Sequence, residues 1–214
     1  DVELTEGGYL SGLGAGGDLL YAVVSQALYR SDDRGISWTL IATGEQYQAP
    51  SEILGVEPST GSSLLISNWT PALGATGYVD LVTKGGGWSS IPTPVVAKGG
   101  AVEWNASDSM VPLKTLHIFG AGLGTLYSKS SEGSAWTQGP NFTLSVAAAN
   151  GKAIAAAEAR LMYSANAGQT WQIVKVGEAD FQAGAVAYAP TQPAIAYAVE
   201  RAKSGPTAPC RVAR

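Results

Sequence analysis

The sequence predicts an all-β protein, a β-propeller of four-stranded antiparallel blades, on three observations. The first is an internal repeat, a motif that occurs at 28–38 and again at 161–171. The second is the tryptophan that closes this motif and its two weaker copies. Successive tryptophans lie 50, 48 and 35 residues apart, and a period of about 40–50 residues is typical of propeller blades. The third is the 27 glycines and 11 prolines, which suit many short strands joined by tight turns.

The two strong copies of the motif share six positions at fixed spacing. Both follow the pattern apolar-x-x-Ser-x-(Asp/Asn)-x-Gly-x-(Ser/Thr)-Trp. Two weaker copies end at Trp88 and Trp136, and each keeps a glycine three residues before the tryptophan but lacks the acidic residue. The serine, Asp/Asn, glycine and tryptophan positions of the strong copies are Ser31, Asp33, Gly35, Trp38, Ser164, Asn166, Gly168 and Trp171.

The chemistry of the motif is that of a tight turn between two strands. The Asp33 carboxylate can accept backbone N–H groups within the turn, as Asp and Asn do in Asx turns. Asn166 can replace it in the second copy, because it too has a short side chain with an acceptor oxygen. Gly35 supplies a positive φ at no steric cost, and Trp38 returns the chain to the core with a large apolar area. The motif therefore predicts architecture and gives no indication of catalysis.

The repeats also predict the number of blades. Two strand–turn–strand segments marked by a proline, 53–66 and 185–197, accompany the motif copies. Four motif-bearing units and the further strand pair at 185–199 together indicate about five blades, or part of a larger ring. We expect one propeller domain at 1–200, followed by a C-terminal tail at 201–214. Hydrophobic residues make up 45% of the 214-residue chain, enough for the core of one domain.

The motif resembles the Asp-box, or BNR, repeat of the sialidase-type β-propellers. Similar repeats occur in xyloglucanase-type glycoside hydrolases, sortilin-type receptor domains and a photosystem II assembly factor. In these families the box lies at the periphery of the blade, away from the axis where ligands bind. The resemblance therefore implies a fold and a structural role for the motif residues, and it implies no particular activity.

Four acidic residues outside the motif copies are the catalytic candidates, since a xyloglucanase-type hydrolase needs two carboxylates on opposite sides of a cleft. None of these four residues lies in a motif of the families that the repeat resembles. The chain has six arginines but lacks the Arg-Ile-Pro motif with which a sialidase begins. The one histidine, His117, lies in an apolar segment and is expected to be structural. The sequence thus favours a non-enzymatic protein, with a glycoside hydrolase of the sialidase or xyloglucanase type, or a fragment of one, as the alternative. The four candidates are Asp80, Glu103, Asp108 and Asp180.

Three of the five asparagines begin N-glycosylation sequons, at Asn68, Asn105 and Asn141. These sequons predict a secreted or extracellular glycoprotein, or one of an organelle lumen, and chance matches in a chain rich in Ser and Thr are the alternative. Cys210 is the only cysteine, so a disulfide would have to join it to another chain, and otherwise it is a free thiol. With one cysteine and one histidine, no metal site and no cofactor are expected.

Charge and hydropathy limit the classes of partner. The net charge is −4 and charged residues make up only 14% of the chain, with no basic patch, so nucleic acid is not an expected partner. No stretch approaches the roughly 20 apolar residues that span a bilayer, so no membrane insertion is expected. We therefore expect a non-enzymatic secreted glycoprotein that acts as an interaction or structural module of a larger extracellular assembly, with other protein chains or glycans as partners. A photosystem-type assembly factor, which would bind a polypeptide, is the second alternative.

Overall fold

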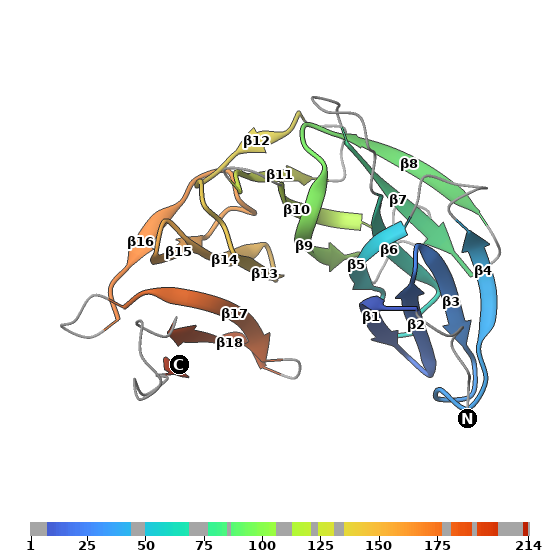
Figure 1. Ribbon diagram of the computed structural model, residues 1–214. Coiled ribbons are helices and arrows are strands. Elements are labelled where there is room, and N and C mark those ends of the chain that lie inside the picture. The colour runs from blue at the N-terminus through green and yellow to red at the C-terminus, as the bar shows by residue number, and fades with distance from the viewer. Residues whose placement is uncertain are drawn as a thin grey trace. The chain divides into compact units, whose positions relative to one another are not determined.

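A computed structural model describes residues 8–43, 50–68, 77–84, 87–105, 113–120, 124–130, 135–176, 181–189, 192–200 and 212–213. Within these residues every regular element is a β-strand, and the strands form five antiparallel sheets (Figure 1). The chain divides into two compact units, residues 1–99 and 100–214.

The first unit contains two sheets of four strands. In each sheet the strands are hydrogen-bonded in the order in which they follow one another along the chain. We call these sheets the first and second blades. The first blade comprises β1 (Leu10–Gly16), β2 (Leu19–Val24), β3 (Ala27–Ser31) and β4 (Thr39–Thr43), and the second β5 (Pro50–Val56), β6 (Ser63–Asn68), β7 (Gly77–Thr83) and β8 (Trp88–Thr93).

The core of the first unit lies between the facing sides of these two blades. Alternate residues of β2, among them Tyr21 and Val23, point toward the second blade and pack against buried residues such as Ile66. Gly14 on β1 permits the close approach, since a Cβ there would lie 2.7 Å from the Val56 side chain. The buried cluster contains Leu19, Tyr21, Val23, Leu28, Ala42, Val56, Leu64, Ile66 and Val82.

The second unit contains three sheets, which we call the third, fourth and fifth blades; the first residues of β9 belong to the first unit. The third blade comprises β9 (Ala97–Trp104), β10 (Leu113–Gly120), β11 (Leu126–Ser130) and β12 (Thr137–Gln138). The fourth comprises β13 (Ser145–Ala149), β14 (Lys152–Ala157), β15 (Arg160–Ser164) and β16 (Gln172–Val174). The fifth comprises β17 (Ala183–Ala189), β18 (Gln192–Glu200) and β19 (Val212–Ala213).

The fourth blade is packed on both of its faces. One face buries Val146, Ala155 and Met162 against Leu126 of the third blade, with Phe119 and Trp171 beside them. Strand β17 of the fifth blade lies against β13 and β14. The alanines of these strands allow the close approach, because small side chains keep neighbouring backbones near one another.

The prediction of an all-β fold with four-stranded antiparallel blades is confirmed. Four of the five sheets have four strands in sequential order, which is the arrangement of a propeller blade. The fifth has three strands in the part of the chain that the structure describes. The expected domain limits at 1–200 and 201–214 stay a prediction.

Candidate functional site

The first repeat turn, Ser31–Trp38, joins β3 to β4 and is held by its own side chains. The Asp33 carboxylate accepts hydrogen bonds from the Ser37 N–H at 2.8 Å, the Ser37 hydroxyl at 2.6 Å and the Ser31 hydroxyl at 2.8 Å. The Ser31 oxygen accepts the Gly35 N–H at 2.7 Å. These bonds, above all the one from the Ser37 hydroxyl, lower the pKa of the Asp33 carboxyl to about 2.

The second repeat turn, Ser164–Trp171, joins β15 to β16 with the same bonds except one: the Asn166 amide N–H donates to the Thr170 hydroxyl at 3.0 Å, whereas in the first turn the Ser37 hydroxyl donates to Asp33. The Asn166 side-chain oxygen accepts the Thr170 N–H and the Ser164 hydroxyl, both at 2.9 Å, and the Ser164 oxygen accepts the Gly168 N–H at 2.9 Å. Gly35 and Gly168 have φ values of 92° and 84°. In both turns the polar groups bond one another, which is the chemistry of a structural turn.

The weaker copy before Trp88 closes its turn with a hydroxyl in place of a carboxylate. The Thr83 hydroxyl oxygen accepts the Gly87 N–H at 3.1 Å, and the Thr83 N–H donates to the Gly87 carbonyl at 2.9 Å. In the other weaker copy, the Lys129 ammonium lies 5.8 Å from the centre of the Trp136 ring. Gly85 and Gly133 lie outside the described residues.

The second repeat turn packs against the third blade. Gly168 lies directly against Ser128 and His117, and the Trp171 ring meets the imidazole edge-to-face at 6.4 Å. His117 Nδ1 bonds the Ser128 hydroxyl at 2.8 Å, while Nε2 has no partner within the described part of the chain. Burial lowers the pKa of His117 to about 4, so the imidazole is neutral at pH 7 and is closed off from solvent.

The structure describes two of the four acidic candidates. Each of the two carboxylates accepts hydrogen bonds from neighbouring residues of the fold. Asp80 on β7 is buried and accepts the Ser90 hydroxyl from β8 at 2.5 Å. Glu103 on β9 accepts the Gly151 N–H with both oxygens at 2.9 Å and pairs with the Lys114 ammonium at 2.8 Å. Asp80 belongs to the first unit and Glu103 to the second. Asp108 and Asp180 lie outside the described residues.

The described residues contain no group of three or more His, Cys, Asp or Glu side chains that could hold a metal ion. The same residues include no helix suited to crossing a membrane.

The predicted modification sites are only partly described. Asn105 directly follows β9 and is half-buried. Asn141 is also half-buried, and its side-chain oxygen accepts the Thr125 hydroxyl at 2.8 Å. Asn68 ends β6, but its side chain lies outside the described residues, as does Cys210. Glycosylation and an intermolecular disulfide stay predictions.

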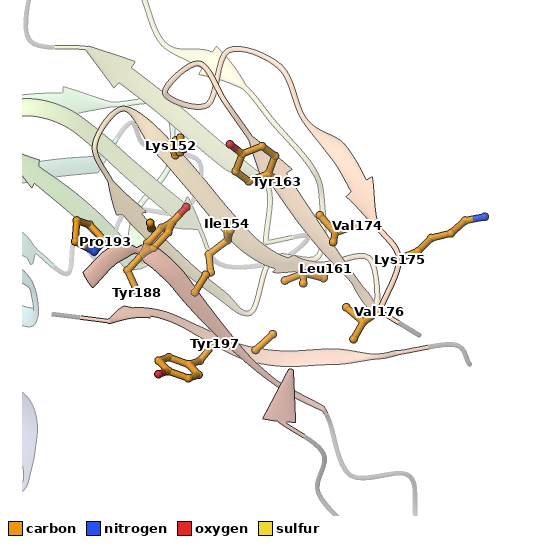
Figure 2. Close-up of a pocket in the computed structure, with 13 residues that line it drawn as sticks. Lys152, Ile154, Leu161, Tyr163, Val174, Lys175, Val176, Tyr188, Pro193 and Tyr197 are labelled. Carbon is orange, nitrogen blue, oxygen red and sulfur yellow. The ribbon is translucent and has the colours of Figure 1, made fainter. Parts of the chain in front are cut away.

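A pocket of about 630 Å³ lies between the fourth and fifth blades (Figure 2). Its wall is mostly aliphatic, and the polar groups around it include the Tyr163 and Tyr188 hydroxyls and Lys152. Burial, reinforced by Tyr163 and Glu103, raises the pKa of Tyr188 to about 12, so this hydroxyl stays protonated and can donate a hydrogen bond at neutral pH. The side chains that form the wall include Ile154, Leu161, Tyr163, Val174, Tyr188 and Ala196.

The repeat explains why a pocket occurs at this place. In the third blade, the cross-strand pair His117 and Ser128 receives Gly168 from the repeat turn of the next blade. The pair at the corresponding place in the fourth blade is Ile154 and Tyr163, and these two side chains line the pocket. The fifth blade places no repeat turn there in the part of the chain that the structure describes. Sequence reasoning missed the pocket because its residues come from five strands and share no motif.

Comparison with known proteins supports the fold. No protein-family model and no curated protein matches the chain. Among solved structures, YCF48 bound to D1 peptide is similar with a TM-score of 0.64 and 11% identity, over 94% of this chain and 64% of that one. The nidogen/laminin complex is similar with a TM-score of 0.59 and 11% identity, over 89% and 72%. An ancestral GH74 enzyme is similar with a TM-score of 0.61 and 12% identity, over 91% and 28%.

These neighbours are β-propellers, and the likeness shows that this chain has the β-propeller fold. At 11–12% identity it shows the fold alone. The chain spans less than two thirds of the length of YCF48, at 64%.

Proposed function

We propose that this chain is a non-enzymatic β-propeller module that binds a polypeptide partner in the pocket between its fourth and fifth blades. One observation carries the proposal: the pocket lies where the preceding pair of blades holds a polypeptide turn. Its aliphatic wall would bury an apolar side chain, at roughly 25 cal/mol for each Å² removed from water. The hydroxyls of Tyr163 and Tyr188 would bond the backbone of the partner, since tyrosine combines apolar surface with a polar tip.

The two acidic candidates that the structure describes, Asp80 and Glu103, support a binding role over a glycoside hydrolase. Hydrolysis needs one carboxylate held protonated and a second across a cleft. Asp80 is buried beside Ser90, and Glu103 is occupied by an ammonium and a backbone N–H. Turnover of a polysaccharide by the purified chain, lost in Asp80→Asn or Glu103→Gln, would favour the hydrolase instead.

Two of the structural neighbours were solved with polypeptide partners, which agrees with this proposal. YCF48 is bound to D1 peptide, and nidogen is in complex with laminin. The hydrogen bonds of the two repeat turns support placing the chain among the Asp-box propellers. The sequons at Asn68, Asn105 and Asn141 support a secreted or lumenal glycoprotein in a larger extracellular assembly. The intact mass of native material before and after enzymatic N-glycan removal tests that part, and an unchanged mass would favour the assembly-factor alternative.

A peptide copied from the chain itself tests the pocket. The probe is a fluorescent cyclised peptide of residues 160–174, which carries the second repeat turn that fills the corresponding place on the third blade. We expect saturable binding in fluorescence polarisation and at least about tenfold weaker binding by Leu161→Lys, because a charge would enter the apolar wall. The control is Leu144→Glu, which changes an exposed leucine that does not line the pocket. Binding that Leu161→Lys leaves unchanged, or no binding at all, would refute the proposed site.

A further inference from the structure

Three hydrogen-bond donors gather at one end of the pocket between the fourth and fifth blades. Lys152 begins β14, two residues before Ile154, and Tyr163 is the cross-strand partner of Ile154. Tyr188 comes from the fifth blade. In the view of Figure 2 the Tyr163 and Tyr188 hydroxyls lie on the side of Lys152. We call Lys152, Tyr163 and Tyr188 the donor end.

The other end of the pocket is aliphatic. Leu161 and Val174 pair across β15 and β16, two residues along the strands from Tyr163, and Val176 lines the wall beside them. Lys175 also borders this end, but its side chain extends away from the wall (Figure 2). The pocket is therefore apolar at one end and rich in donors at the other.

The donor end has a positive charge that no carboxylate of the pocket balances. The residues that line the pocket include two lysines and no Asp or Glu. Lys152 is exposed and belongs to no ion pair in the part of the chain that the structure describes. Glu103, whose charge acts on the Tyr188 hydroxyl, is paired with the Lys114 ammonium at 2.8 Å. An ammonium and two hydroxyls without an anionic acceptor are suited to bind a carboxylate.

The third blade shows how a repeat turn lies at the corresponding place. There Gly168 lies against Ser128, and the Trp171 indole lies against Gly139, where a Cβ would be 2.9 Å from Nε1. Gly139 is two residues after Thr137, the cross-strand partner of Ser128. The turn therefore runs along the strands of the third blade, from Ser128 toward Gly139 as the chain passes from Gly168 to Trp171.

The same two positions exist in the fourth blade. Tyr163 corresponds to Ser128, and Val174 corresponds to Gly139. A turn bound in the pocket in the same way would place its glycine at Tyr163 and its tryptophan at Val174. Residues that precede the glycine would then lie beyond Tyr163, toward Lys152.

A side chain at the position of Val174 is compatible with this placement. The first blade has Ile41 there, three residues after Trp38, just as Val174 is three residues after Trp171. Both Ile41 and Trp88 of the second blade pack on the core cluster of the first unit. A β-branched side chain and the tryptophan of the next blade thus share one core.

We propose that the polypeptide turn bound in this pocket carries an acidic residue shortly before its glycine, and that the donor end binds the carboxylate. The inference rests on the proposed function, because it names the kind of segment that the pocket takes. Each tyrosine hydroxyl would donate its proton to the carboxylate and keep its lone pairs for a backbone N–H of the partner.

The chain itself contains a repeat turn with such an acid. The position three residues before the motif glycine is Asp32 in the first repeat turn and Ala165 in the second. The Asp32 side chain is 48% exposed. A carboxylate at this position can therefore point outward from a repeat turn, where a second surface could bind it.

A single substitution in the peptide probe tests the inference. The fluorescent cyclised peptide of residues 160–174 is compared with the same peptide carrying Ala165→Asp or Ala165→Lys. In fluorescence polarisation at low salt and neutral pH, we expect the Asp peptide to bind at least about fivefold more tightly than the unsubstituted one, because charge-assisted hydrogen bonds are the stronger kind. The Lys peptide should bind more weakly, and high salt should reduce both differences.

Charge reversal on the protein shows which lysine is responsible. Lys152→Glu should reverse the preference, so that the Lys peptide binds more tightly than the Asp peptide. Lys175→Glu is the matched control, since it changes the other lysine of the pocket, which extends away from the wall, and it should leave the preference in place. Tyr188→Phe should reduce the advantage of the Asp peptide. Circular dichroism and the urea midpoint confirm that the three variants are folded.

The outcomes separate this inference from the proposed function. If the unsubstituted peptide binds but the Asp peptide gains nothing, the acidic partner is refuted and the pocket remains a polypeptide site. A gain that Lys152→Glu leaves unchanged, or that Lys175→Glu removes equally, would overturn the assignment of the donor end. If none of the three peptides binds, the proposed function fails and this inference fails with it.

Discussion

Replacing Gly168 with alanine tests whether the second repeat turn is locked against the third blade. An alanine at φ of +84° costs about 1–2 kcal/mol, because its Cβ crowds the following carbonyl. The new Cβ would also lie 2.6 Å from Ser128 Cβ and 2.9 Å from His117 Cε1, inside the ordinary carbon contact of about 3.5–4.0 Å. Moving packed neighbours apart costs a further 1–3 kcal/mol or so. We therefore expect Gly168→Ala to lower the free energy of unfolding by about 2–5 kcal/mol.

Gly35→Ala is the matched control in the first repeat turn. Its φ of +92° gives the same backbone cost, but the nearest atoms to a new Cβ are Leu20 Cδ1 at 3.5 Å and Trp38 Cζ2 at 3.9 Å. Gly168→Ala should therefore be more destabilising by about 1–3 kcal/mol. The assay is urea unfolding followed by tryptophan fluorescence. The unfolding transition of residues 1–99 is compared for Gly35→Ala, and that of residues 100–214 for Gly168→Ala. An equal loss of unfolding free energy in the two variants would show that packing against Ser128 and His117 does not constrain the turn.

Three further predictions concern titrating groups and the repeat turn. The pKa of His117 is near 4 in the folded chain and 6.5 ordinarily, so the unfolded state binds more protons between these values. The free energy of unfolding should fall as the pH drops from about 6.5 to about 4, by at most about 1.4 kcal/mol per pH unit. Urea unfolding at several pH values checks this, and His117→Gln should remove that slope. Asp33→Ala should lower the thermal midpoint more than Asp33→Asn, because an amide oxygen can still accept the Ser37 N–H; equal losses would contradict that role. Tyr188 should ionise near pH 12 in an ultraviolet titration, and a titration curve unchanged in Tyr188→Phe would refute the assignment.

The sequence by itself determined the blade motif and the fold class. The bonds that hold a repeat turn join residues at most four positions apart, such as Ser31 with Gly35 and Asp33 with Ser37. Chemistry of such short range depends on residue type and spacing alone, so both are visible in the sequence. Repetition of the motif then predicts several similar sheets, because one β-sheet must bury a face against another.

Only the tertiary structure decided what lies between the blades. Glu103 is one carboxylate among many in the sequence, but folding brings it to the Gly151 N–H, 48 positions away. His117 meets Gly168, and Ile154 faces the fifth blade, through contacts that no local pattern encodes. The same repeat position is filled beside His117 and open beside Ile154, because its environment is set by the neighbouring blade. Hydrogen bonds within a turn are local, whereas packing between sheets depends on which distant segments the fold brings together.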